Sequence, residues 1–215
     1  MDGSDTFKDL KDGKVPRLDT CDVLVYADPA TSNKDVSSGS YKAVGVIAKK
    51  GFDYYIAKVF LDTMSNARFV DALFECYAYC KAKRVENVSV YIENNSLQNP
   101  FYEQVILPAI YQKANAEKTF LPVVPDTRDK KDKYTRIEGL LEPIHRLGHL
   151  IFNEAEADDP HMKRLKAQFG NFSRKQKRMD GCDMVEGGVF ILKEREAVEA
   201  AGGIVSVTRK NDKRF

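Results

Sequence analysis

The feature that most constrains the fold is a run of three strand-like segments at the start of the chain. Residues 22–28 form a short apolar segment that Pro29 closes, because proline disfavours continuation of a regular strand. Residues 41–48 and 52–61 are rich in β-branched and aromatic side chains, and the Lys-Lys-Gly break at 49–51 between them is typical of a hairpin turn. The chain therefore opens with strands that include an antiparallel hairpin.

After the hairpin the apolar period becomes helical and then alternates. Residues 66–83 place Ala67, Val70, Leu73 and Phe74 on one face, as an amphipathic helix requires. Further strands are predicted at 88–93, 119–124 and 149–152, and further helices at 99–113, 134–147, 160–169 and 179–193. The order predicts an α/β fold, a mixed sheet with an antiparallel hairpin plus parallel strands and helices on both faces.

Two prolines fall inside the predicted helices. Pro108 lies within the segment 99–113, where we expect a kink. Pro143 lies within 134–147 and argues against an unbroken helix there.

The domain organisation follows from length and composition. Residues 1–20 are polar and are expected to be a linker or disordered N-terminus without a signal-peptide core, 21–200 one domain, and 201–215 a basic tail. No apolar run approaches the roughly 20 residues that a bilayer span needs. We therefore expect a cytosolic protein with no membrane partner.

Charge and cysteine content exclude little by themselves. The net charge is only +2, so any DNA-binding surface must come from local clustering of basic residues. Cys76 and Cys80 are four apart on a predicted helix, a spacing that could hold a metal, but no further Cys or His group completes such a site. Buried reduced thiols are the simpler expectation.

Three acids occupy positions from which side chains can converge. Asp28 and Glu93 end predicted strands, and Asp180 begins a predicted helix, so all three can meet at one edge of the sheet. Clustered carboxylates repel one another unless a cation neutralises them, and their hard oxygen atoms suit Mg²⁺ or Mn²⁺. A turn or a helix cap explains each acid equally well when it is considered alone.

The sequence around these acids resembles the nuclease domain of phage terminase large subunits, in order from about residue 21 to residue 193. The matching motifs are Asp28-Pro29-Ala30 with Asp35 in the following loop, Ile92-Glu93-Asn94-Asn95, Lys133-Tyr-Thr-Arg136-Ile137 with Leu141-Glu-Pro143 and Gly148-His-Leu-Ile-Phe152, and Arg178-Met-Asp180-Gly-Cys-Asp183.

The resemblance implies a ribonuclease H-like fold, two Mg²⁺ or Mn²⁺ ions, and endonucleolytic cutting of concatemeric phage DNA during genome packaging. It implies that Asp28 bridges the two ions, that Glu93 holds one of them, and that Asp180 or Asp183 completes the metal site, with Asp180 preferred. The late motif departs from the family pattern of two adjacent acids, so the choice between these two stays open. Asp35 and Asn94 would be outer residues of the site.

The resemblance also implies partners. These are double-stranded DNA, a terminase ATPase domain, a small terminase subunit and a portal, in the cytoplasm of an infected or lysogenic bacterial host. No Gly-x-x-x-x-Gly-Lys-Ser/Thr loop occurs in the sequence, so we expect a nuclease domain separated from the motor.

A basic run just before Asp180 is the candidate DNA-binding surface. Between His161 and Met179 there are seven Lys or Arg residues and no acid, with Phe169 and Phe172 interleaved. Such a run would bind the phosphate backbone without reading bases, or would simply be a solvated basic face. The DNA-binding candidates are Lys133 and Arg136, which match the family block, with Lys163, Arg164, Arg174, Lys175, Lys177 and Arg178.

Two other functions remain open at this point. The same fold and ions could serve a resolvase or an exonuclease acting on branched or hybrid nucleic acid, since fold does not fix substrate. A module that has lost its metal ions could instead bind DNA or a portal without catalysis. Binding of divalent cations separates this last possibility from the other two.

Overall fold

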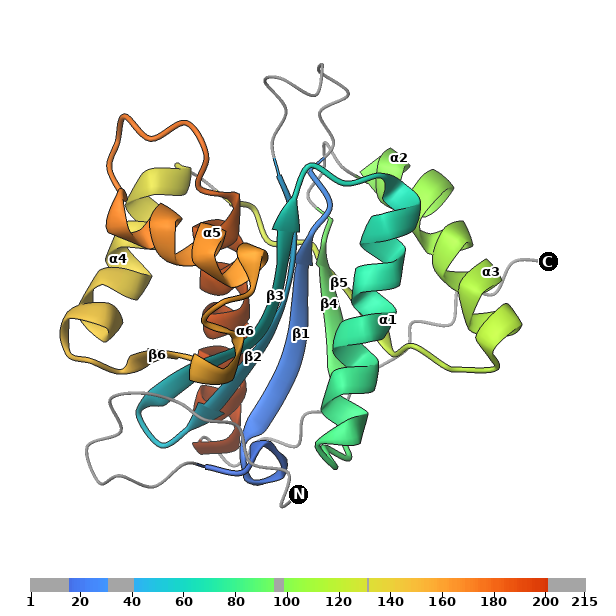
Figure 1. The fold of residues 1–215 in the computed structure, drawn as a ribbon, viewed down its shortest axis with the longest axis horizontal. Helices are drawn as coiled ribbons and strands as arrows, with labels where there is room; N and C mark the ends of the chain where they lie inside the picture. Colours follow the sequence, from blue (N-terminus) through green and yellow to red (C-terminus); the bar gives the residue numbers. More distant parts are fainter. Residues whose placement is uncertain (1–15, 31–40, 95–98, 131, 201–215) are drawn as a thin grey trace.

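A six-stranded mixed sheet forms the centre of the computed structural model, which describes residues 16–30, 41–94, 99–130 and 132–200 (Figure 1). The strands are β1 (Asp22–Asp28), β2 (Lys42–Lys50), β3 (Asp53–Asp62), β4 (Ser89–Glu93), β5 (Val123–Asp126) and β6 (Leu150–Phe152). The helices are α1 (Asn66–Ala82), α2 (Asn99–Phe101), α3 (Leu107–Glu117), α4 (Lys133–Arg146), α5 (Pro160–Gly170) and α6 (Asp180–Ala200), with a π-helical turn at Tyr102–Ile106 and 3₁₀ turns at Leu18–Thr20 and Glu154–Glu156.

The strand order is β5-β4-β1-β2-β3-β6. Strand β2 runs antiparallel to β1 and β3, whereas the pairs β1–β4, β4–β5 and β3–β6 are parallel. The carboxyl ends of β1, β4 and β5 therefore lie side by side at one edge of the sheet, where ligands bind in open α/β sheets. The last residues of these three strands are Asp28, Glu93 and Asp126.

Helices cover both faces of the sheet, with α1, α2 and α3 on one side and α4, α5 and α6 on the other (Figure 1). Alternate residues of β1 enter the two cores, because successive side chains of a strand point to opposite faces. Val25 packs in the core with α1, whereas Leu24 and Tyr26 pack in the core with α6. Both faces of β1 are thus buried, which explains its nearly continuous apolar sequence.

Helix α6 crosses the sheet in close contact with β1 and β2 (Figure 1). Every residue of its first half, 180–189, is buried. Two adjacent glycines allow this approach, since a Cβ atom built on Gly187 would lie 2.3 Å from the Tyr26 ring and one on Gly188 would lie 2.2 Å from Ile47. The close contact fixes which side chains of α6 face the sheet edge.

The predicted fold class is confirmed, with three differences of detail. The strand expected at 119–124 lies instead at Val123–Asp126, so Asp126 is the last residue of a strand. At Pro108 the chain stays helical, and a π-helical turn directly precedes α3. Helix α4 continues through Pro143 to Arg146, although the proline has no N–H to bond the carbonyl of Gly139.

Three further points concern the domain boundary, the predictions that fall outside the described residues, and membrane-spanning helices. Leu18 is buried in the core, so packed structure begins before residue 21, where the boundary was expected. Asp35 and the basic tail 201–215 lie outside the residues that the structure describes. None of the described helices combines the length and the apolar composition that a bilayer span requires.

Candidate metal centre

Three carboxylates from distant parts of the chain meet at the carboxyl edge of the sheet. Asp28, Glu93 and Asp183 each offer one oxygen atom, and these atoms lie within 4.8 Å of one another. All three side chains are buried. We call this group the acidic cluster.

Each member of the acidic cluster is positioned by its element. Asp28 and Glu93 end the neighbouring parallel strands β1 and β4. The backbone N–H of Ala30 donates to Asp28 Oδ1 at 3.0 Å, which fixes the orientation of that carboxylate. Asp183 lies in the first turn of α6, where the helix dipole favours negative charge.

Asp180, the preferred ligand from the sequence, lies beside this group but is engaged elsewhere. Its Oδ2 accepts a hydrogen bond from the backbone N–H of Tyr41 at 2.9 Å, and its Oδ1 accepts one from Lys133 Nζ at 2.9 Å. The carboxylate therefore links the start of β2 and the start of α4 to α6. The geometry favours Asp183 over Asp180 as the third member of the acidic cluster.

Burial and like charge alter the protonation of Asp28. Its pKa is raised from 3.8 to about 7, chiefly because burial disfavours the charged form and also because Glu93 lies close, while Lys133 opposes the shift. A carboxylate with a raised pKa inside an acidic cluster is one that a bound cation would strongly stabilise in its charged form.

Asp183 has the opposite shift. Burial by itself would raise its pKa, but the nearby cations Lys133, Lys130 and Arg136 together hold the pKa below its usual value. Lys133 Nζ lies 3.1 Å from Asp183 Oδ2, and an Arg136 guanidinium nitrogen lies 2.7 Å from Asp183 Oδ1. Asp183 is therefore held in its charged form by the surrounding basic residues.

Lys130 is the cation most deeply embedded in the cluster. Its Nζ donates to Glu93 Oε2 at 2.6 Å and to the Tyr26 hydroxyl at 2.9 Å. The same Nζ lies 3.9 Å from Asp183 Oδ1. Tyr26 in turn donates to Asp126, so a polar network runs from β1 through β4 to β5.

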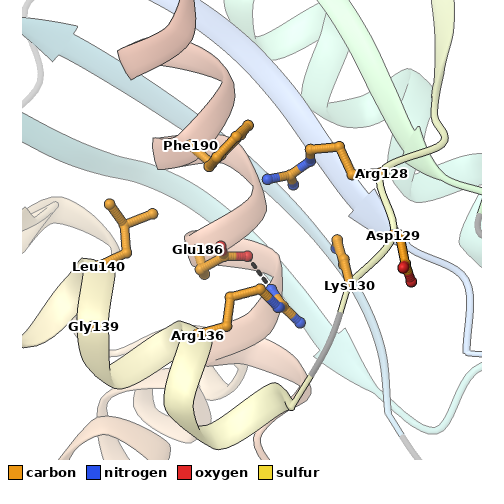
Figure 2. Close-up of a pocket in the computed structure, with 8 residues that line it drawn as sticks. All are labelled: Arg128, Asp129, Lys130, Arg136, Gly139, Leu140, Glu186 and Phe190. Carbon is orange, nitrogen blue, oxygen red and sulfur yellow. Dashed lines mark hydrogen bonds and ion pairs between the residues drawn. The ribbon is translucent and has the colours of Figure 1, made fainter.

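A second network lies one turn further along α6 (Figure 2). Glu186 is buried and pairs with Arg136, which also binds Asp183. Burial raises the pKa of Glu186, and Arg136 opposes this shift. The Arg128 guanidinium donates to both oxygens of the Asp126 carboxylate, at 2.9 Å to Oδ1 and 2.7 Å to Oδ2, and lies over the Phe190 ring at 3.9 Å from its centroid.

An open groove of about 530 Å³ lies between α4, α6 and the segment after β5 (Figure 2). Its lining includes Arg128, Arg136, Glu186 and Phe190. Figure 2 shows Arg128, Lys130 and Arg136 arranged around Glu186 on its rim. Lys130 and Arg136 line the groove and also pair with Glu93 and Asp183 of the acidic cluster, so the groove and the cluster are continuous.

The acidic cluster fits divalent cations by its own chemistry. Its members are hard oxygen ligands, converge within 4.8 Å and are buried, and mutual repulsion contributes to the raised pKa of Asp28. Asn94 lies directly after Glu93, and its backbone N–H donates to the Asp126 carbonyl at 2.8 Å, tying β4 to β5 beside the site.

The predicted DNA-binding residues fall into three groups. Lys133 and Arg136 point inward to the acids described above. Lys163 pairs with Asp158 at the surface, and Arg164 binds Asp62 and the Leu61 carbonyl.

The third group lies in the segment just before α6. Arg174, Lys175 and Lys177 are exposed, and Arg174 lies over the ring of Tyr134, which stacks on Phe172 at 5.0 Å. Arg178 donates to the Tyr41 hydroxyl at 2.7 Å and lies over the Tyr41 ring. All four basic residues precede Asp180 by six residues or fewer.

Sequence reasoning missed three residues of the site. Asp126 was missed because the strand that it ends was expected at residues 119–124. Glu186 follows Asp183 by three residues, a spacing that places both on one side of a helix and could have identified it. Lys130 lies among alternating acidic and basic residues, and no local sequence signal distinguishes it from its neighbours.

The comparisons with known proteins show the fold. The human cytomegalovirus terminase nuclease domain, in an Mn-soaked and inhibitor-bound structure, superposes with a TM-score of 0.59 at 14% identity, covering 81% of this chain and 85% of that chain. A second structure of that domain gives a TM-score of 0.58 at 16% identity, covering 82% and 85% of the two chains. The chain thus shares the fold of that nuclease domain, an α/β fold built on a mixed six-stranded sheet.

Sequence comparison adds no family assignment. No protein-family model matches the chain, and no curated protein matches it. The two structures described above come from a human virus, so they support a terminase-type fold without a specific relation to phages.

Proposed function

We propose that this protein is a divalent-metal-dependent nuclease that hydrolyses phosphodiester bonds of DNA as an endonuclease. The observation that carries the proposal is the acidic cluster, in which buried carboxylates of β1, β4 and α6 converge within 4.8 Å. Neither a turn nor a helix cap explains why residues so far apart in sequence share one buried site. Lys130, Lys133 and Arg136 neutralise only part of the acidic charge, and a cationic ligand would neutralise the remainder.

The chain's own residues would divide the work in a simple way. Asp28, Glu93 and Asp183 would hold the divalent ions, two Mg²⁺ or Mn²⁺. When bound, such ions would supply an activated water and stabilise the leaving oxygen. Arg136 would orient Asp183, and Asp180 would orient Lys133 near the scissile phosphate.

The DNA would approach over the exposed basic residues beside α6. Arg174, Lys175 and Lys177 are exposed and form no ion pair with an acid among the residues that the structure describes, so they can contact phosphates of double-stranded DNA. Such contacts position the duplex without selecting a sequence. Binding should therefore weaken steeply as salt concentration rises.

We further propose a terminase role, the cutting of concatemeric phage DNA during genome packaging. The similarity of fold to the cytomegalovirus terminase nuclease domain and the motifs shared with phage terminases support it. In that role the partners would be an ATPase domain, a small terminase subunit and a portal, in the cytoplasm of a bacterial host.

Cleavage of supercoiled plasmid in the presence of Mn²⁺ or Mg²⁺ tests the proposal. The parent protein should nick and linearise the plasmid, whereas Asp28→Ala and Glu93→Ala should lose cleavage while keeping their circular dichroism spectra. A Holliday junction and an RNA–DNA hybrid serve as competing substrates. Cleavage of these alone would favour a resolvase or hybrid-specific enzyme, and divalent-independent DNA binding without cleavage would favour a non-catalytic module.

The third ligand is tested by a matched pair of variants on α6. Asp183→Asn should abolish cleavage, because it removes a ligand oxygen from the acidic cluster. Asp180→Asn should retain measurable cleavage, reduced by about 10- to 100-fold as is usual for residues that orient a metal site. The reverse order of effects would restore Asp180 as the ligand.

A further inference from the structure

Lys130 holds a position inside the acidic cluster that a metal ion would also use. Its side chain is only 5% exposed and lies 2.6 Å from Glu93, whose own side chain is 7% exposed. The ammonium group also lies 3.9 Å from Asp183. One cation therefore bridges two of the three acids of the cluster.

The charges around the site support a limited capacity for metal. Six acids lie in the connected networks, namely Asp28, Glu93, Asp126, Asp180, Asp183 and Glu186. Four basic residues contact them, namely Arg128, Lys130, Lys133 and Arg136. With all groups charged the excess is two negative charges, which one divalent cation neutralises.

We propose that the Lys130 ammonium occupies one of the two cation positions of the acidic cluster, so that one divalent ion binds with Lys130 in place and a second must displace Lys130 from Glu93. This inference rests on the proposed function, since it concerns the same site. It assigns Lys130 as a competitor of the second ion and makes occupancy of that position conditional.

The groove beside the cluster provides a place for the displaced side chain. Lys130 lines this groove with Arg128 and Arg136, so the groove offers its side chain space outside the acidic cluster. A DNA phosphate near the groove would attract the released ammonium and add a negative charge to the site. DNA should therefore favour entry of the second ion, because it compensates the extra positive charge.

Manganese binding to the full chain, measured by calorimetry and by electron paramagnetic resonance without DNA, tests this inference. The parent should bind one Mn²⁺ per chain tightly and a second at least tenfold more weakly. Lys130→Met keeps the length of the side chain and removes its charge, and should tighten the second site by about tenfold or more, or about 1.4 kcal/mol. Lys130→Arg should resemble the parent, and Lys193→Met, at an exposed position of α6, is the matched control.

Each other outcome decides against the inference or against the function beneath it. If Lys130→Met binds the same number of ions with the parent's affinities, Lys130 does not compete. If it loses the first site as well, Lys130 holds Glu93 in place for the metal and is not a competitor. Two equally tight sites in the parent would overturn the inference alone, whereas no Mn²⁺ binding by the parent would overturn the proposed function. Circular dichroism spectra and melting curves of each variant exclude misfolding as the cause.

Discussion

At the scale of single residues, the surroundings of Asp28 set its chemistry. Its carboxyl group is buried at the end of β1 between Glu93 and Asp183, and its pKa is raised to about 7. The folded protein without metal thus binds a proton that the unfolded chain, with an ordinary pKa of 3.8, releases. Protonation and metal binding are alternative ways to neutralise the same group.

This linkage predicts a pH-dependent stability in the metal-free protein. Between about pH 4 and pH 7 the folded state binds more protons at Asp28, so the free energy of unfolding should decrease as pH rises through this window. Asp28→Asn should remove this loss and be more stable than the parent at pH 8, by at most about 4 kcal/mol for a shift of about three pKa units. Denaturant unfolding in EDTA from pH 4 to pH 8 measures the difference.

The control for this experiment is Asp158→Asn at a fully exposed surface position. It should leave stability and its pH dependence nearly unchanged, as is usual for surface substitutions. A gain for Asp28→Asn that is equal at pH 4 and pH 8 would show that burial does not raise the pKa of this carboxyl group.

Some residues of the candidate site could be predicted from the sequence, and others could not. Asp28 and Glu93 were found because each ends a strand whose apolar pattern is unmistakable, and the structure places both in the acidic cluster. Asp183 and Asp180 both lie in the first turn of α6, and the preference for Asp180 drawn from the sequence differs from the geometry, which groups Asp183 with Asp28 and Glu93. Lys130 and Glu186 acquire their roles only through contacts with residues far away in the chain.

At the scale of elements, the packing of α6 on the sheet controls the site. Gly187 lies against the ring of Tyr26, which is fully buried and bound through its hydroxyl to Asp126 and Lys130. The ring cannot move away without breaking this polar network. A side chain at Gly187 would therefore push α6, and Asp183 with it, away from β1.

Gly187→Ala is accordingly expected to destabilise the protein by about 1–3 kcal/mol, the usual cost of overpacking a core. This is opposite to the effect of alanine at an open helical position, which gains about 1 kcal/mol over glycine. Gly139→Ala in α4 is the matched control, since nothing lies within 4 Å of a Cβ atom built there, and it should be neutral or stabilising. Thermal unfolding of both variants checks the prediction, and equal melting temperatures would contradict it.

The elements themselves were largely predictable because their signals are local. Helices α1, α4 and α5 begin after Ser65, Asp132 and Asp159, whose side chains cap the first turn. Strand β5 was displaced in the prediction because only four residues form it and Pro125 interrupts its pattern. Its place is fixed by pairing with β4, which is a tertiary contact.

At the scale of the whole molecule, a cation in the acidic cluster would join parts that are far apart in sequence. Strands β1 and β4 belong to the sheet, whereas Asp183 belongs to the helical layer on one of its faces. A ligand bound only in the folded state stabilises every part that must be assembled to form its site. Metal binding should therefore raise the stability of both layers together.

At a Mn²⁺ concentration of 100 times the dissociation constant, stabilisation should reach about 2.7 kcal/mol. For a domain of this size the melting temperature should rise by roughly 5–10 °C. Circular dichroism and tyrosine fluorescence should report the same shift, and Asp28→Asn should show none. A shift that persists in Asp28→Asn would place the binding site elsewhere.

The sequence by itself determined the succession of elements, the mixed character of the sheet and two of the three clustered acids. These features depend on apolar periodicity, turn residues and strand ends, which are properties of short segments. Only the tertiary structure decided that Asp183 faces Asp28 and that Lys130 lies on Glu93. The physical reason is that rotation of α6 about its axis is set by close packing of Gly187 and Gly188 on the sheet, and that burial brings charges from separate segments within range of one another.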